Sequence, residues 1–193
     1  MKKAFLFSPL IVLCVMVGVL IMGKLKAREK GPDQLGELPK FELIDQDGNI
    51  FDSTHVKSSA RVVNFMFTQC NGICPSLSAE MVKIQKLFRS PNALELISVS
   101  IDPKNDTPEN LRAFIKERKV NTKNWSYLTG EKENIAKIMS QYFKIAFHDN
   151  IQTHTERFVL IDKNNQIRGY YSMASDNKAF ARLKKDISWL LHH

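Results

Sequence analysis

The chain alternates between continuous apolar runs and amphipathic stretches, a pattern typical of strands joined by helices. Three apolar runs have the length and composition of buried strands: 62–67, 94–101 and 157–162. After the first run, Leu77, Met81, Ile84 and Phe88 recur at helical spacing on one face of a predicted helix over 75–88. The pattern therefore predicts an α/β domain with helices packed on a sheet whose strands are buried on both faces.

Weaker signals complete the series of elements. A hairpin is predicted where two short apolar stretches flank the turn Asp45-Gln46-Asp47-Gly48, and a second where 163–165 separates two strands. Thr107-Pro108 is a helix start, with Thr107 as the cap. The predicted elements are, in order, a hairpin (41–44, 49–51), strand 62–67, helix 75–88, strand 94–101, a helix from 108, strand 125–130, helix 131–143, a hairpin (157–162, 166–171) and a last helix over 180–190. This order describes a thioredoxin-like α/β sandwich with an N-terminal β-hairpin.

The first apolar stretch of the chain has a different character. Residues 4–23 carry no charge, and about 20 apolar residues suffice for a helix to cross a bilayer. A cleaved signal peptide is the rival interpretation, but 25–27 matches a small-x-small cleavage site poorly. A lipoprotein site at Cys14 is disfavoured because Leu13 precedes it and the apolar run continues past it. We expect one uncleaved N-terminal transmembrane helix.

Charge and composition divide the chain into three parts. We expect an anchor with its flanks over 1–30, a linker rich in charge, Gly and Pro over 31–40, and one domain over 41–193. The net charge is +8, and residues 1–30 contribute most of the excess. No basic stretch with interleaved aromatic residues follows, so nucleic acid is not an expected partner. Basic residues flank both ends of the apolar stretch, so charge alone leaves its membrane orientation open.

The segment Thr68–Pro75 carries the chemistry. Cys70 and Cys74 lie between a predicted strand and a helix that Pro75 opens, where two sulfurs can meet each other or one soft metal ion. The helix N-terminus is expected to favour the thiolate. The C-x3-C spacing is one residue longer than that of common thiol oxidoreductases and leaves room for a metal. A purely stabilising disulfide is the weaker alternative, because so short a loop gains little from being closed.

Two thiolates need a further ligand to complete a metal site. The chain has five histidines, at 55, 148, 154, 192 and 193. His148 and His154 bracket a polar loop before strand 157–162, which lies beside the cysteine loop in this topology, although position alone favours a surface role for either. Two thiolates and an imidazole select copper or zinc. Copper fits better, because structural zinc normally has four protein ligands and no hydrolytic constellation is present.

Four ordered blocks show a family resemblance. FTQCNGICP, SVSIDPKNDTPENL, WSYLTG and HTERFVLID resemble motifs of the Sco/SenC proteins, membrane-anchored thioredoxin-like copper chaperones of cytochrome c oxidase assembly. The resemblance covers about 38–191. It implies that Cys70, Cys74 and His154 bind copper. Asn71 and Thr153 depart from residues common in the family, and neither departure removes a ligand.

The resemblance implies a copper-binding chaperone that delivers copper to the copper-bearing subunit of cytochrome c oxidase. The alternative is an enzyme, a thiol-disulfide oxidoreductase in which Cys70 and Cys74 reduce the cysteines of that subunit. Other copper chaperones or thiol reductants are further expected partners. The expected location is the cytoplasmic membrane, with the domain on its outer side. Asp102 and Asp106 of the second block are expected to end a strand and to help cap the next helix. A peroxidase of related fold is disfavoured because the residues before Cys70 lack that group's pattern.

Overall fold

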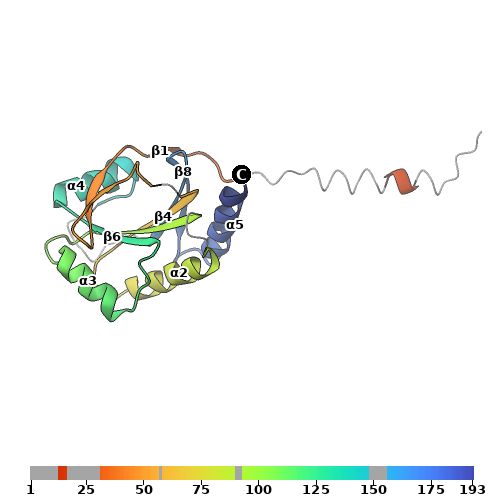
Figure 1. Cartoon of the computed structure of the whole chain (residues 1–193). Coiled ribbons are helices and arrows are strands. Elements are labelled where there is room, and N and C mark those ends of the chain that lie inside the picture. The colour runs from red at the N-terminus through yellow and green to blue at the C-terminus, as the bar shows by residue number, and fades with distance from the viewer. Residues whose placement is uncertain (1–12, 17–30, 57, 90–92, 148–155) are drawn as a thin grey trace, which may run out of the picture. The chain divides into compact units, whose positions relative to one another are not determined.

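The structure is a computed structural model of the 193-residue chain and describes residues 13–16, 31–56, 58–89, 93–147 and 156–193 (Figure 1). The chain forms two units, Met1–Gly31 and Pro32–His193. In the first unit residues 13–16 are helical. No helix within the described residues is both long enough and apolar enough to span a bilayer. The predicted anchor over 4–23 lies largely outside them and stays a prediction.

The second unit is built on one mixed sheet with helices on both faces (Figure 1). The strands follow the order β1-β8-β7-β4-β5-β6-β2-β3, in which β4, β5 and β6 are parallel. The strands are β1 (Gly36–Glu37), β2 (Glu42–Asp45), β3 (Ile50–Asp52), β4 (Ala60–Met66), β5 (Leu94–Ser100), β6 (Trp125–Thr129), β7 (Arg157–Asp162) and β8 (Gln166–Ser172). The helices are α2 (Cys74–Leu87), α3 (Pro108–Glu117), α4 (Lys132–Lys137), the π-helix η1 (Ile138–Tyr142) and α5 (Ala179–His192). The predicted α/β order is confirmed.

β4 is mostly apolar on both of its faces because both faces are covered. Val62 and Met66 belong to the core that α2 and α5 cover, whereas Val63 and Phe65 belong to the core under α4 and η1. Successive side chains of a strand point to opposite faces, so a central strand with two covered faces is apolar at nearly every position. Arg61 and Asn64 are the polar exceptions. The Asn64 side chain accepts a hydrogen bond from Ser98 Oγ at 2.6 Å, and the Arg61 side chain donates to the carbonyls of Ser53 and Asp162 at 3.0 and 3.1 Å.

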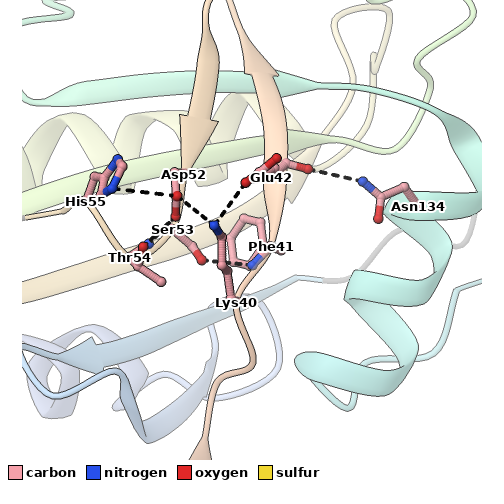
Figure 2. Close-up of polar contacts among 8 residues, drawn as sticks. All are labelled: Lys40, Phe41, Glu42, Asp52, Ser53, Thr54, His55 and Asn134. Carbon is pink, nitrogen blue, oxygen red and sulfur yellow. Dashed lines mark hydrogen bonds and ion pairs between the residues drawn. The ribbon is translucent and has the colours of Figure 1, made fainter.

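The predicted N-terminal hairpin is confirmed as β2 and β3, which add to the β6 edge of the sheet. Figure 2 shows the base of the hairpin, where Lys40 Nζ lies 3.0 Å from carboxylate oxygens of both Glu42 and Asp52. Asn134 of α4 donates a hydrogen bond to the carbonyl of Glu42 at 3.1 Å. The hairpin is therefore fixed to the helix that covers its end of the sheet.

Part of the predicted linker over 31–40 belongs to the domain. Gly36–Glu37 form β1, which pairs with β8, and Leu38 is fully buried. Arg168 of β8 donates a hydrogen bond to the carbonyl of Pro32 at 2.6 Å. Backbone pairing, one buried leucine and hydrogen bonds to backbone carbonyls hold this segment, and none of these gives the repeating apolar pattern that identifies the other strands in the sequence.

Candidate functional site

The two cysteines lie where β4 ends and α2 begins. The backbone N–H of Cys70 donates to the carbonyl of Phe67 at 3.3 Å, and Cys74 is the first residue of α2, one position earlier than the predicted start. Ile73, the residue before the helix, offers no capping side chain, and Pro75 needs no hydrogen-bond partner for its nitrogen. Both cysteines are thiols and both are buried, with 7% and 5% of their surface exposed.

The acidity of Cys74 differs from the expectation for a thiol at a helix start. Burial, together with a hydrogen bond to the Cys70 thiol, raises the pKa of Cys74 to about 12. The helix N-terminus favours the thiolate, but burial and the neighbouring sulfur disfavour it more strongly. The prediction of a depressed pKa for this cysteine was therefore wrong. At neutral pH Cys74 is a thiol that must lose its proton before it binds a metal.

A buried carboxylate holds the loop that carries the cysteines. Asp106 is fully buried and accepts hydrogen bonds from the Thr68 backbone N–H at 3.1 Å, from the Thr68 hydroxyl, and from Ser100 Oγ at 2.6 Å. Burial raises the pKa of the Asp106 carboxyl. Since Thr68 lies two residues before Cys70, Asp106 ties the segment after β5 to the cysteine loop.

Of the roles predicted for Asp102 and Asp106, the structure confirms the first and contradicts the second. Asp102 follows β5, as expected, and its carbonyl accepts the backbone N–H of Asp106 at 2.8 Å. The α3 cap is Thr107, whose side chain accepts from the Asn110 backbone N–H at 3.4 Å, so the expectation that Asp106 helps cap this helix was wrong. Asp106 turns inward because buried hydroxyl and N–H donors surround its carboxylate.

An apolar cavity of about 210 Å³ opens beside the sulfurs. We call it the apolar cavity; its lining includes Cys70, Cys74, Phe67, Phe114, Trp125 and Tyr127. The hydroxyl of Tyr127 is buried and has no hydrogen-bond partner in the part of the chain that the structure describes. A space of this size with two thiols in its wall can take one apolar side chain of a binding partner.

The third predicted ligand, His154, and its alternative, His148, lie outside the described residues. His55 is exposed and lies 3.8 Å from Asp52, in agreement with the predicted surface position (Figure 2). Among the described residues no cluster of three or more His, Cys, Asp or Glu side chains could hold a metal ion. The described site therefore supplies two sulfur donors, a set that suits a soft ion such as copper and that needs a ligand from elsewhere.

Sequence reasoning missed Thr68 and Ser100, which complete the network around Asp106. The available signal was polar residues at the ends of two apolar strands: Ser100 closes β5, and Thr68 follows β4. Because β4 and β5 are parallel neighbours, their carboxyl ends meet at one edge of the sheet. A polar cluster at that edge could have been expected.

Comparison with known proteins connects this site with one family. The family model described as SCO1/SenC matches residues 29–189. A SCO1 protein homolog of Bacillus subtilis is 35% identical over 95 residues, and the matched stretch spans 49% of this chain and 49% of the relative, so the match covers about half of each protein. A putative copper-binding protein of Stutzerimonas stutzeri is 25% identical over 142 residues, 69% of this chain and 68% of that one.

Two solved structures share the fold. The crystal structure of a SCO1/SenC family lipoprotein from Bacillus anthracis superposes with a TM-score of 0.73 at 34% identity, covering 83% of this chain and 99% of that one. BsSco, described as a member of the Sco family of cytochrome c oxidase assembly proteins with a disulfide switch, has a TM-score of 0.73 at 26% identity and coverages of 83% and 97%. The domain thus has the thioredoxin-like fold of these proteins, as predicted.

Proposed function

The chain belongs to the SCO1/SenC family, and on that premise we propose that it binds copper through Cys70 and Cys74 and delivers it to the copper-bearing subunit of cytochrome c oxidase. The observation that supports this most is the pair of neighbouring thiols in the wall of a cavity at the strand-to-helix junction. His154 is the proposed third ligand. Copper is the cargo, and the cytoplasmic membrane, with the domain on its outer side, is the proposed location.

The chemistry of the donors supports delivery. Two cysteines that release their protons on binding form a soft set, which favours copper over hard cations. Both come from one short loop, so a partner that supplies its own ligands can replace them one at a time. The raised pKa of Cys74 adds a proton that competes with the metal, which makes the site easier to empty as the pH falls.

Metal stoichiometry tests this proposal. Copper bound per chain is measured for the reduced protein and for Cys70→Ser, Cys74→Ser and His154→Ala. We expect each serine variant to lose most of its affinity and His154→Ala to bind more weakly. Unchanged stoichiometry and affinity in all three variants would refute the proposal. His55→Ala, which changes an exposed histidine on the hairpin, is the matched control.

A second function has specific support. The Cys74 thiol is hydrogen bonded to Cys70, so the two sulfurs are close enough to form a disulfide after a small movement. In this role the dithiol would reduce a disulfide of the oxidase subunit: one thiolate attacks, the partner's sulfur leaves, and the second thiolate closes the Cys70–Cys74 disulfide as the partner gains two thiols. A thiol reductant must then regenerate the pair.

The two functions differ in their need for His154. Delivery requires it, whereas disulfide exchange requires the cysteines alone. Oxidase assembly in cells carrying His154→Ala therefore separates them. Assembly that persists although copper binding is lost favours the oxidoreductase, and assembly that fails together with copper binding favours delivery.

A further inference from the structure

A second hollow, of about 550 Å³, adjoins the apolar cavity. Its lining contains five basic residues and no acidic one: Lys86 near the end of α2, Arg89 just after that helix, and Arg118, Lys119 and Lys123 from the connection between α3 and β6. We call it the basic groove. All five side chains are exposed. Val82, Arg118 and Val120 line both hollows, so the groove lies directly beside the cavity that holds the cysteines.

The concentration of positive charge is local. From residue 31 onward the chain has 22 basic and 19 acidic residues, a nearly balanced composition. Five of the basic residues line this groove. Among them Arg118 has an acidic neighbour, Glu117, at 4.0 Å, a distance at which an exposed pair is weak. The groove therefore presents a positive surface on an otherwise mixed domain.

The backbone at Lys119 gives an independent indication. After α3, Val120 N–H donates to the carbonyl of Ile115 at 3.0 Å, and Lys119 N–H donates to that of Lys116 at 3.2 Å, which together form a Schellman motif. Lys119 occupies the left-handed position of this motif, with φ of 51°, where glycine is the favoured residue. Lysine is less favourable than glycine at this position, so the chain carries a cation at the groove at a cost in stability.

We propose that the basic groove docks an acidic segment of a partner protein and that an apolar side chain of this segment enters the apolar cavity beside Cys70 and Cys74. The proposal rests on the proposed function, because it names the chemistry of the protein that exchanges metal or disulfide with the two sulfurs. A protein segment fits better than a membrane surface, since the positive charge lines a hollow that leads to the thiols. The unpartnered hydroxyl of Tyr127 offers a hydrogen bond to a carbonyl of the segment.

Binding of designed peptides tests the docking directly. The protein is the full chain with Cys70→Ser and Cys74→Ser, so neither sulfur-bound metal nor disulfide exchange contributes. The probes are a fluorescent peptide with a leucine followed by alternating Asp and Glu, and its counterpart with Asn and Gln. We expect the acidic peptide to bind about tenfold more tightly at 20 mM NaCl, and the difference to disappear at about 300 mM, where charges are screened over less than 10 Å.

Groove variants locate the site. Lys119→Gly is expected to weaken acidic-peptide binding about two- to threefold while raising the melting temperature by about 2–4 °C, because glycine relieves the strain. The triple variant Lys86→Gln, Lys119→Gly, Lys123→Gln is expected to lose about tenfold in affinity. Lys163→Gln, an exposed lysine in the β7–β8 turn, is the control and should leave binding unchanged.

Three results would overturn the proposal. The first is equal binding of the acidic and neutral peptides at low salt. The second is an effect of Lys163→Gln as large as that of the triple variant. The third is a triple variant that still binds the acidic peptide but no longer binds phosphatidylglycerol vesicles. This result would assign the groove to a membrane surface. Copper stoichiometry of the chain with its cysteines tests the proposed function separately, so failure of one proposal is distinguishable from failure of the other.

Discussion

Replacing Asp106 by alanine is expected to destabilise the domain and to loosen the cysteine loop. The carboxylate is fully buried and accepts hydrogen bonds from the Thr68 N–H, the Thr68 hydroxyl and the Ser100 hydroxyl. Alanine leaves these three donors without their acceptor. The hydroxyls can rotate toward other groups, but the Thr68 N–H is fixed by the backbone.

The size of the effect follows from the number of donors. Each buried donor left unsatisfied costs about 1–3 kcal/mol. Alanine also removes the desolvation cost of the buried carboxyl, which offsets part of this loss, so we expect about 3–5 kcal/mol for Asp106→Ala. Asp106→Asn keeps the shape and one acceptor oxygen and is expected to cost about 1–2 kcal/mol. Ser100→Ala removes a single donor and should cost less than either.

The pH dependence has a definite sign. Burial raises the pKa of Asp106 in the folded protein, so the folded state holds this proton more firmly than the unfolded state. The resulting stabilisation is fully present below the ordinary carboxyl pKa, near 4, and declines as the pH rises through the folded value. Asparagine cannot titrate. The stability difference between the wild type and Asp106→Asn should therefore be largest at low pH and narrow as the pH rises.

Urea unfolding followed by tryptophan fluorescence measures these differences, and the rate at which Cys70 and Cys74 react with a thiol reagent measures loop mobility. We expect the thiols of Asp106→Ala to react several-fold faster than those of the wild type. Asp47→Ala, at an exposed turn position, is the control. A loss below about 1 kcal/mol together with unchanged thiol rates would show that Asp106 does not hold the loop.

Three further predictions concern single groups. Tyr127→Phe should leave the free energy of unfolding unchanged or raise it by up to about 1 kcal/mol, because the hydroxyl that it removes is buried without a partner; a clear loss of stability would contradict this. Hydrogen bonds from Thr54 and Lys40 lower the pKa of Asp52, so this carboxylate stabilises the fold above its ordinary pKa and less as the pH falls; Asp52→Asn should make acid unfolding shallower. Alkylation of Cys74 by iodoacetamide should still accelerate at pH 10, since its pKa is raised to about 12, and a plateau below pH 8 would argue against this.

The elements that sequence predicted well are those whose side chains follow a period. β4 is apolar at five of its seven positions because both faces are covered, and α2 repeats its buried residues every turn. The part of the site that depends on local sequence could be predicted. Cys70 and Cys74 follow the apolar run of β4 and precede the periodic residues of α2, so both had to lie at the junction of these two elements. β1 escaped prediction because two residues paired through their backbone leave no pattern.

Features that depend on tertiary burial could not be obtained in this way. The pKa of Cys74 was expected from the helix start alone, whereas desolvation determines it. Asp106 meets Thr68 across 38 positions of sequence, and only the parallel pairing of β4 with β5 makes them neighbours. The basic groove likewise joins residues at and just after the end of α2 to residues after α3, and the sequence alone does not show that these two segments are neighbours.

The basic residues of the groove do not activate the Cys74 thiol. Burial and the neighbouring thiol keep Cys74 protonated, and no described lysine or arginine is among the groups that set its pKa. A cation placed against the sulfur would favour the thiolate and expose it to any oxidant or metal that diffuses in. Basic residues in an adjoining groove can attract an acidic partner over about 8–10 Å at moderate salt without activating the thiols. Recruitment would then precede chemistry, because only a docked partner brings its ligands or its disulfide to the apolar cavity where the two sulfurs lie.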